Sequence, residues 1–417
     1  MEKYVINGGF KLNGSVKVES AKNAVLPMLA CACLTDEEVI IENCPKINDV
    51  ISMLEILSSI GVKTRFESGS LVIKADGLNS CFVSKELSEK LRSSIYMSGA
   101  LLARLNRSQV FLPGGCDIGE RPINIHLDGF RKMGANCVLE NGGVFCQTQG
   151  LVGNKIVLNF PSVGATENLM IVASLAKGKT EIINPAREPE VVDLMRFLNS
   201  MGAKIYGAGT GTILIEGVAK LHGTKFKPIP DRIETGTFLV ATAITGGELE
   251  IKGCFAKNIS PLIHKLCENA CKISLKNDII HIKSCGKRKG FNLVTAPHPG
   301  FPTDMQAQAL ALATVSEGVS VVTETVFEKR FNYVDELVKM GADVSVKGKT
   351  ATVRGVKALH GARVLASDLR GGAALILAGL SAEGQTVVYG AEHVNRGYFE
   401  FDKKLRALGA SVEFLDG

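Results

Sequence analysis

The stretch Leu57–Phe66, with the sequence LSSIGVKTRF, decides how the fold is interpreted, because five later stretches repeat its pattern. Each starts as the end of an amphipathic helix, passes through a glycine or alanine and continues as alternating apolar and polar residues. The other five are FRKMGANCVL (130–139), FLNSMGAKIY (197–206), KLCENACKISL (265–275), LVKMGADVSV (337–346) and LRALGASVEF (405–414). Their break positions are Gly61, Gly134, Gly202, Ala270, Gly341 and Gly409, at intervals of 68 to 73 residues. This spacing predicts six copies of one structural unit.

Each copy is expected to end a helix at the glycine and to continue as a half-buried strand. After five of the six copies a second strand, a glycine-containing turn and a third strand follow, as in ILIEGVAKLHGTKF (213–226). The sixth copy stops at Gly417 without them, and YVINGGFKLNGSVKV (4–18) has the missing form. The sequence therefore predicts that the first strands pair with the last copy.

Three copies per domain follow from this closure. We expect an N-terminal domain over 21–229 and a C-terminal domain made of 1–20 plus 230–417. The prolines of KPIPDR (227–232) suit the second crossing between them. A length of 417 residues is sufficient for two domains that each bury a core.

Every copy also contains a second helix that is apolar on nearly all sides. Such a helix has to be buried on all sides. The six segments are AVLPMLACACL, SIYMSGALLARL, NLMIVASLAKG, GTFLVATAITGG, MQAQALALATVSEG and AALILAGLSAEG. They predict an α/β fold in which three central helices per domain are screened from water by sheets and amphipathic helices.

The composition of the chain limits the kinds of binding partner that are expected. The net charge of +6 is mild, and without a basic block or stripe it argues against nucleic acid. The apolar runs are shorter than the ~20 residues of a spanning helix, and no signal pattern opens the chain, so a cytoplasmic protein without a membrane partner is expected. The eleven cysteines form no CxxC or Cys/His group, which favours buried free thiols over a metal site.

One thiol differs from the others. Cys116 lies in LPGGCDIGERP (112–122), among glycines and charged residues rather than in an apolar stretch. Glycines that accept positive φ keep this segment out of helices and strands. The sequence therefore predicts a loop that carries a reactive group, with a plain surface turn as the alternative.

Charged residues recur where the chain enters each buried helix. Helix N-termini offer free backbone N–H groups and favour anions, so a cation there is unfavourable unless an anion binds. For the aspartates, an N-cap is the ordinary explanation. At the six helix starts the sequence has Lys22, Arg92, the Ser162–Thr166 turn, Asp231, Asp304 and Arg370.

A second series of charges precedes the amphipathic helices. It comprises Lys46, Arg121, Arg187 with Glu188, Lys257, Arg330 and Arg396. Each alone could be surface charge, but the recurrence suggests a cationic cleft if the two domains face each other. Such a cleft suits a multiply charged phosphate compound. Since GxxxxGK[ST] and GxGxxG fingerprints are absent from the sequence, we expect no nucleotide cofactor and no metal.

Several motifs resemble those of the enolpyruvyl transferases, and among them the enzymes that act on UDP-N-acetylglucosamine. They are AKNA (21–24), PGGCDIGERP (113–122), PDRIETGTF (230–238), APHPGFPTDMQAQ (296–308), TETVFEKRF (323–331), SDLRGGAAL (367–375) and NRGY (395–398). The resemblance runs along nearly the whole chain. It implies a two-domain inverted, inside-out α/β barrel. It also implies transfer of enolpyruvyl from phosphoenolpyruvate to the 3′-hydroxyl of UDP-N-acetylglucosamine, with release of phosphate.

The resemblance also implies roles for individual residues. Phosphoenolpyruvate would be held by Lys22, Asn23, Arg121 and Arg396, with Arg92, Arg330 and Arg370 extending the cationic wall. The UDP-sugar would be lined by Arg121, Pro122, Ile123, Asn124, Ile125, Ser162, Val163, Gly164, Asp304 and Val326. Cys116 would be the proton donor and the thiol alkylated by epoxides such as fosfomycin, and we assign Asp304 as the base for the hydroxyl.

Two alternatives remain open at the level of the sequence. An enolpyruvyl transferase that acts on shikimate 3-phosphate shares the inside-out architecture. A non-catalytic clamp is also possible, because pseudo-symmetric repeats build scaffolds as well. Cations at helix starts favour an enzyme, since a scaffold has no need of them.

The role of Cys116 yields a first prediction. Cations nearby lower the pKa of a thiol, and bound phosphoenolpyruvate would offset them. Cys116 should therefore react with an epoxide faster in the free enzyme than with substrates bound. Replacement Cys116→Ala should abolish turnover, whereas Cys116→Asp, still an acid, should retain part of it. Equal alkylation rates with and without substrates, or an active alanine variant, would contradict the assignment.

Overall fold

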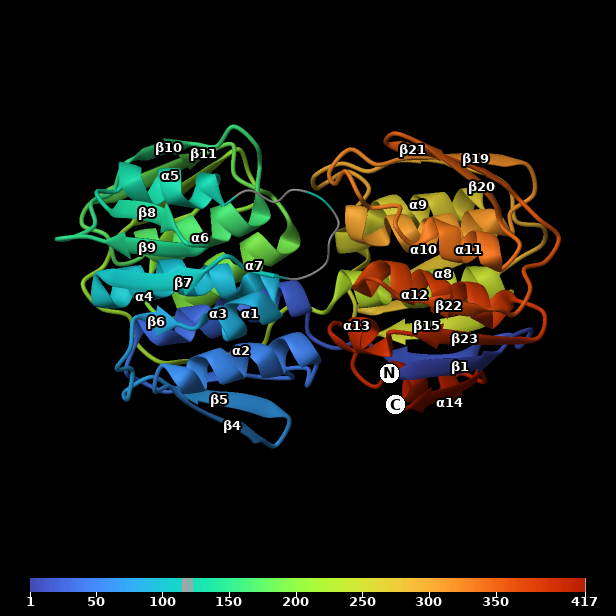
Figure 1. Cartoon of the computed structure of the whole chain (residues 1–417), viewed down its shortest axis with the longest axis horizontal. Helices are drawn as coiled ribbons and strands as arrows, with labels where there is room; N and C mark the ends of the chain where they lie inside the picture. Colours follow the sequence, from blue (N-terminus) through green and yellow to red (C-terminus); the bar gives the residue numbers. More distant parts are fainter. Residues whose placement is uncertain (115–118, 120–122, 417) are drawn as a thin grey trace. The chain divides into compact units, whose positions relative to one another are not determined.

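The computed structural model describes residues 1–114, 119 and 123–416. The chain divides into two compact units. The first, here the C-unit, joins Met1–Glu19 to the chain from Pro230 onward. The second, here the N-unit, contains nearly all described residues from Ser20 to Ile229. Figure 1 shows the elements of each unit.

The elements of the N-unit are α1 (Lys22–Cys31), η1 (Ala32–Leu34), β3 (Val39–Ile41), α2 (Asn48–Ser59), β4 (Lys63–Glu67), β5 (Ser70–Lys74), β6 (Phe82–Val83), α3 (Lys85–Lys90), η2 (Arg92–Ile95), α4 (Tyr96–Leu105), β7 (Arg107–Phe111), α5 (Asn124–Lys132), β8 (Asn136–Glu140), β9 (Gly143–Gln147), β10 (Lys155–Val157), α6 (Val163–Ala173), β11 (Lys179–Ile183), α7 (Pro189–Ser200), β12 (Lys204–Tyr206), β13 (Thr212–Glu216) and β14 (Thr224–Phe226).

The elements of the C-unit are β1 (Lys3–Asn7), β2 (Asn13–Lys17), α8 (Arg232–Thr245), β15 (Glu248–Lys252), η3 (Ala256–Ile259), α9 (Ser260–Glu268), β16 (Cys271–Lys276), β17 (Ile279–Ser284), β18 (Asn292–Val294), η4 (Thr303–Met305), α10 (Gln306–Thr314), β19 (Val319–Thr323), α11 (Val334–Lys339), β20 (Asp343–Lys347), β21 (Thr350–Arg354), β22 (Arg363–Leu365), α12 (Leu369–Ser381), β23 (Gln385–Tyr389), α13 (Ala391–Asn395), α14 (Phe401–Ala407) and β24 (Ser411–Leu415).

The described strands form six sheets of one design, three in each unit. In the sheet β10-β11-β13-β12, the edge strand β10 runs parallel to β11, and the other neighbours are antiparallel. The sheet β18-β19-β21-β20 repeats this order and these directions in the C-unit. Each sheet takes its edge strand from the preceding copy, so the three sheets of a unit are linked in a ring.

The break positions have the predicted backbone. Gly61, Gly134, Gly202, Gly341 and Gly409 have φ between 89° and 96°. The fourth copy places Ala270 at φ 57°, in the left-handed region that a side chain disfavours. The six stretches therefore end their helices in the same way, and one copy does so with a less suitable residue.

The N-terminal strands complete the C-unit, and the first of them pairs with the sixth copy, as the sequence predicted. Strand β1 lies between β23 and β24 and pairs with both in antiparallel fashion, and Ile6 opposes Val412. Strand β2 then pairs in parallel with β15. The first strands of the chain thus take the places that the sixth copy leaves empty, and they close the ring of sheets.

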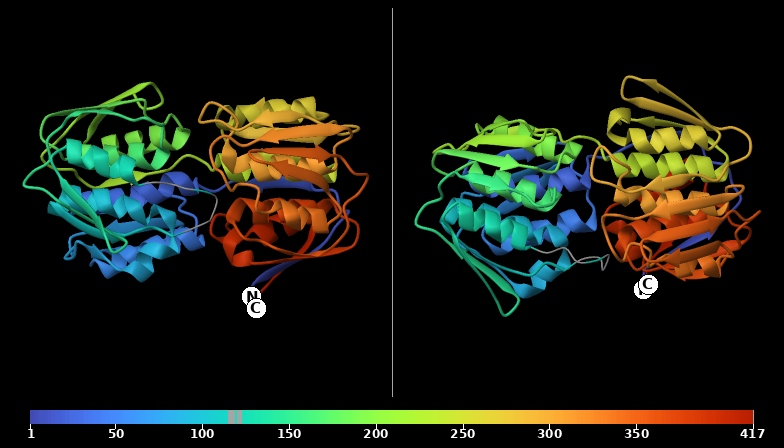
Figure 2. Two further views of the ribbon diagram at one scale, coloured as in Figure 1. Left: turned by 45° about the horizontal axis from the view of Figure 1, so that its top comes forward. Right: turned by 90° about the horizontal axis from the view of Figure 1, so that it is seen from above.

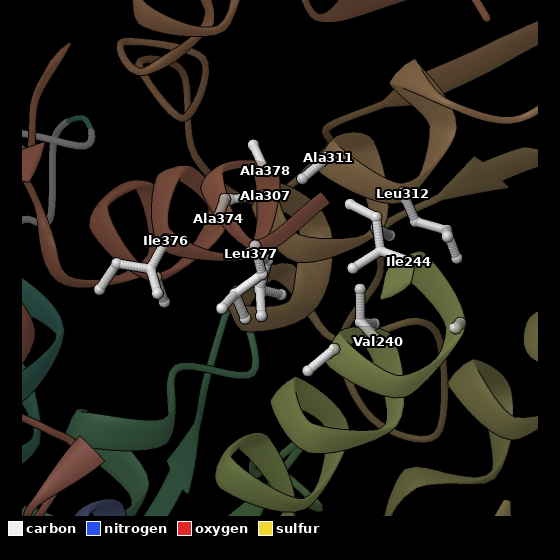
Figure 3. Close-up of a cluster of buried hydrophobic side chains, with 14 of the residues drawn as sticks. Val240, Ile244, Ala307, Ala311, Leu312, Ala374, Ile376, Leu377 and Ala378 are labelled. Carbon is white, nitrogen blue, oxygen red and sulfur yellow. The ribbon is translucent and has the colours of Figure 1, made fainter. Parts of the chain in front are cut away.

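The apolar helices form the centre of each unit. In the C-unit α8, α10 and α12 contact one another, and in the N-unit α1, α4 and α6 do the same. In Figures 1 and 2 the sheets lie at the outside of each unit and these helices lie within. Figure 3 shows Val240, Leu312 and Leu377, one from each of these three helices, among the buried side chains of the C-unit. The expected inner helical core is confirmed.

Ala270 provides a test of the repeat. Substitution Ala270→Gly should raise the free energy of unfolding of the C-unit by about 0.5 kcal/mol, because relief of left-handed strain exceeds the added freedom of the unfolded chain. Gly409→Ala, at the equivalent position of the sixth copy, should lower it by about 1 kcal/mol. Hydrogen exchange of the C-unit would measure both changes. A destabilising Ala270→Gly would mean that the two positions are not equivalent.

Candidate active site

The start of α1 holds the first cation of the N-unit. Lys22 is the first residue of this helix, and its Nζ lies 2.8 Å from Oδ2 of Asp49 in the first turn of α2. The side chains are only 12% and 5% exposed. Asn23 follows in α1 and is half-buried. Asp49 therefore fixes the direction of the ammonium group at the start of a buried helix.

Arg92 begins η2, the turn that leads into α4. Next to it lies a buried polar cluster between α4 and α6, in which the Tyr96 hydroxyl donates a short hydrogen bond to Glu167. Burial raises the pKa of the Glu167 carboxyl well above its usual value, and the charges of Glu190 and Glu188 act in the same direction. Burial therefore favours the neutral form of the Glu167 carboxyl.

His126 connects two motifs that lie far apart in the sequence. It is in the first turn of α5, after Ile123, Asn124 and Ile125, and its Nδ1 lies 3.0 Å from Nδ2 of Asn168 in α6. Burial, with a contribution from the positive charge of Arg92, lowers the pKa of His126 to about 3, so the ring is neutral. A methyl group added at Gly164 would touch this ring.

The start of α6 lies beside that ring. The Ser162 side chain accepts a hydrogen bond from the Ala165 N–H at 3.3 Å and caps the helix. Val163 and Gly164 are its first two residues, and they carry N–H groups that the helix itself does not use. The structure thus brings the predicted segments 123–125 and 162–164 together through His126.

Three predicted residues meet in the C-unit. Asp304 lies in η4, just before α10, and one carboxylate oxygen is 2.6 Å from the Arg330 guanidinium while the other is 3.0 Å from that of Arg370. The arginine side chains are 4% and 5% exposed, and Asp304 is 26% exposed. These contacts hold the carboxylate between two buried cations.

The pKa of Asp304 reflects this environment. Burial alone would raise the pKa of the carboxyl, but the positive charges of Arg370 and Arg330 outweigh it and hold the pKa well below its usual range. Asp304 is therefore ionised at neutral pH. A carboxylate held in this way accepts a proton only when the two cations are drawn away or neutralised by another anion.

The starts of the three inner helices meet at this point. Arg370 is the second residue of α12, Asp304 precedes α10, and the charge of Arg232 at the start of α8 also lowers the pKa of Asp304. Arg370 further donates to the Tyr398 hydroxyl at 3.3 Å, two residues after Arg396 at the end of α13. Val326 lies in the turn after β19.

The helix starts only partly follow the sequence expectation. Asp231 is an N-cap, since its carboxylate accepts from Ile233 N and Glu234 N at 2.7 and 3.0 Å. Asp304 instead pairs with arginines. The expectation that a cation at a helix start implies a bound anion was incomplete, because Lys22 and Arg370 already have carboxylates of the protein beside them.

Part of the predicted site lies outside the described residues. Cys116, Arg121 and Pro122 fall there. Residues that the sequence reasoning missed are Asp49, Tyr96, His126, Glu167 and Asn168. Asp49 could have been suspected from its place in NCPKIND, before an amphipathic helix, but nothing local marks it as the partner of Lys22.

The described residues contain no group of three or more His, Cys, Asp or Glu side chains arranged to hold a metal ion. None of the helices in the described part of the chain is both long enough and apolar enough to span a membrane.

Solved structures share this architecture. The enolpyruvyl transferase NikO from Streptomyces tendae superposes with a TM-score of 0.90 at 24% identity, covering 100% of this chain and 99% of that one. EPSP synthase from Acinetobacter baumannii superposes with a TM-score of 0.78 at 20% identity, covering 100% of both chains. At these identities the likeness concerns the fold, a two-domain inside-out α/β architecture.

Sequence comparison then defines the family. The family model for EPSP synthase (3-phosphoshikimate 1-carboxyvinyltransferase) matches residues 6–405. A protein of Caldanaerobacter subterraneus subsp. tengcongensis named UDP-N-acetylglucosamine 1-carboxyvinyltransferase 2 is 50% identical over 414 residues, 99% of each chain. One of the same name from Carboxydothermus hydrogenoformans is 47% identical over 415 residues, also 99% of each. The chain belongs to the EPSP synthase family of carboxyvinyltransferases.

The low pKa of Asp304 predicts a pH-dependent contribution to stability. A depressed carboxyl pKa stabilises the folded state above the unfolded value of about 3.9, and the contribution is lost as the pH falls from there toward the folded pKa. Asp304→Asn leaves two buried cations without their carboxylate and should cost about 3 kcal/mol at pH 7.

Urea unfolding of both proteins from pH 7 to pH 3 would check this. The difference between wild type and Asp304→Asn should be constant down to about pH 5 and then narrow. Asp343→Asn, in an exposed pair with Arg354, is the control and should change stability by less than about 0.5 kcal/mol. If the difference in free energy of unfolding between wild type and Asp304→Asn stays the same down to pH 3, the ion pairs around Asp304 contribute little to stability.

Proposed function

We propose that this protein transfers the enolpyruvyl group of phosphoenolpyruvate to the 3′-hydroxyl of UDP-N-acetylglucosamine and releases phosphate, a reaction of peptidoglycan precursor synthesis in the cytoplasm. The observation that carries the proposal is the identity of 47% to 50% along nearly the whole chain to proteins named for this reaction. The residues of the two units support it by supplying a carboxylate, several cations and a free helix N-terminus.

The chemistry is an addition followed by an elimination. The sugar oxygen forms a bond to C2 of the enol, its proton passes to a base, and C3 accepts a proton from an acid. Loss of a C3 proton then restores the double bond as the C2–O bond to phosphate breaks. We assign Cys116 as the acid and Asp304 as the base.

The surroundings of Asp304 determine when it can act as a base. Arg330 and Arg370 suppress its basicity in the free protein. Phosphoenolpyruvate carries a carboxylate and a phosphate, which compete for guanidinium groups in the same fork geometry. Binding of this substrate would neutralise the two cations and raise the pKa of Asp304. The base would therefore become effective only when the donor substrate is bound.

The N-unit would supply the remaining contacts. Lys22, oriented by Asp49, and Asn23 would bind phosphoenolpyruvate together with Arg92, Arg121 and Arg396. The free N–H groups at the start of α6 suit the diphosphate of the nucleotide sugar, because a helix N-terminus favours anions. No step in this scheme requires a metal or an organic cofactor.

Shikimate 3-phosphate is the alternative acceptor, because the matching family model is described by that activity. Identity to the solved EPSP synthase is only 20%, against 50% to a relative named for the nucleotide sugar. Both acceptors would give an enol ether and phosphate, so they have to be compared directly.

Phosphate release from phosphoenolpyruvate tests the proposal. With UDP-N-acetylglucosamine the purified protein should release phosphate in proportion to the sugar consumed. With shikimate 3-phosphate, release should be at least about 1000-fold slower, since the site would lose its contacts to the nucleotide. Cys116→Ala serves as the inactive control. Faster release with shikimate 3-phosphate would assign the other activity, and release with neither acceptor would overturn the proposal.

A further inference from the structure

Glu324 is a buried carboxylate with no role in the scheme above. It follows β19, where Ser320 and Val322 point into the C-unit, and it continues this alternation inward. Its exposure is only 1%. A charged residue at an inward position of a strand requires compensation, because removing a carboxylate from water is costly unless donors replace the solvent.

Four donors surround this carboxylate. Oε1 accepts from the Thr295 hydroxyl at 2.8 Å and from the backbone N–H groups of Val326 at 2.7 Å and Phe327 at 3.2 Å. Oε2 accepts from the Thr303 hydroxyl at 2.8 Å. A carboxyl side chain suits these surroundings, since its two oxygens together offer several acceptor positions.

The residues that donate to Glu324 include members of two parts of the proposed site. Thr303 directly precedes Asp304, and its carbonyl oxygen also accepts from Arg330 at 3.4 Å. Val326 and Phe327 form the turn after β19, and Val326 is the proposed contact to the nucleotide sugar. One carboxylate thus connects the turn that carries the base to the turn that contacts the acceptor.

The sheet does not depend on Glu324 for its closure. Thr295 N donates to Thr323 O at 2.9 Å, and Thr325 N donates to the Thr295 hydroxyl at 2.9 Å, so the ends of β18 and β19 are joined without it. The Glu324 backbone N–H bonds separately to Lys349 O at 2.8 Å. Three of the four donors to the side chain lie in the two turns, and the fourth, the Thr295 hydroxyl, lies at the end of β18.

We propose that Glu324 is a positioning residue that aligns Asp304 with the acceptor hydroxyl by tying the Thr303 turn to the Val326 turn. This inference rests on the proposed function. Displacement of a reacting group by about 1 Å can lower a rate about 100-fold, so a residue that fixes the relative position of base and acceptor affects catalysis without touching the reacting atoms.

Three variants separate the two connections. Glu324→Ala removes both. Glu324→Gln keeps a carbonyl oxygen for the Val326 and Phe327 N–H groups and places an amide opposite Thr303. Thr303→Val removes the connection to Asp304 alone and leaves the carboxylate bonded to the other turn. Each protein would be assayed for kcat, for the KM of both substrates and for binding of UDP-N-acetylglucosamine by calorimetry.

We expect the variants to differ in whether they change kcat alone or both kcat and the KM for the nucleotide sugar. Glu324→Ala should raise the KM and the calorimetric Kd for the nucleotide sugar at least about tenfold and lower kcat about 100-fold. Thr303→Val should lower kcat about tenfold with the KM for the nucleotide sugar within about threefold of wild type. Glu324→Gln should resemble Thr303→Val. The KM for phosphoenolpyruvate should change least.

Glu336→Ala is the matched control, because Glu336 also accepts a backbone N–H, from Leu365 at 3.0 Å, in the same unit. Its kinetic constants should equal those of wild type. Thermal unfolding of all variants identifies loss of fold, and Glu324→Gln and Thr303→Val test the inference even if Glu324→Ala does not fold.

The outcomes are distinguishable. Wild-type kinetics in folded Glu324→Gln and Thr303→Val, or equal losses of kcat in Glu336→Ala, would overturn the positioning role while the proposed function stands. A wild-type protein without transfer to UDP-N-acetylglucosamine would refute the proposed function first. Calorimetric binding of the sugar that is unchanged in folded Glu324→Ala would remove the connection to Val326.

Discussion

The nearly complete burial of three apolar helices in each unit is the constraint on which the structure depends. A helix without a polar face has no stable place at a surface, so sheets and amphipathic helices have to enclose it. Small residues allow the enclosed helices to approach one another, as with Ala307 and Ala311 on α10 and Ala374 and Ala378 on α12, which Figure 3 shows near the contact. The ring of three sheets is the consequence, and it requires β1 and β2 to close it in the C-unit.

The same constraint determines where chemistry can take place. Buried helices expose polar backbone groups only at their ends, and an N-terminus carries unpaired N–H groups and partial positive charge. In the C-unit the starts of α8, α10 and α12 bring Arg232, Asp304 and Arg370 into electrostatic contact. In the N-unit Lys22 stands at the start of α1 and is held by Asp49. The polar groups of the proposed site are therefore gathered by the core rather than added to its surface.

Charge compensation within the protein explains how cations persist at these helix starts. Lys22 and Arg370 would be unfavourable there alone, and carboxylates at 2.8 and 3.0 Å offset them. Such pairs are also easily redistributed, because an incoming anion competes for the same cations. The low pKa of Asp304 in the free protein and its proposed role as a base are then two states of one ion-pair network, with the donor substrate as the switch.

The sequence by itself determined the repeat, the inner helices, the pairing of the N-terminal strands and the family, because these depend on periodicity and on motifs that are continuous along the chain. The helix end at Ala270 followed from its spacing alone, and the structure added its left-handed backbone. Tertiary structure decided which charges meet. Asp49 beside Lys22, His126 between two separate motifs, and Glu324 between the Thr303 and Val326 turns join residues from different elements. Their distances are set by how buried helices and strand ends pack, and neither composition nor local pattern contains that information.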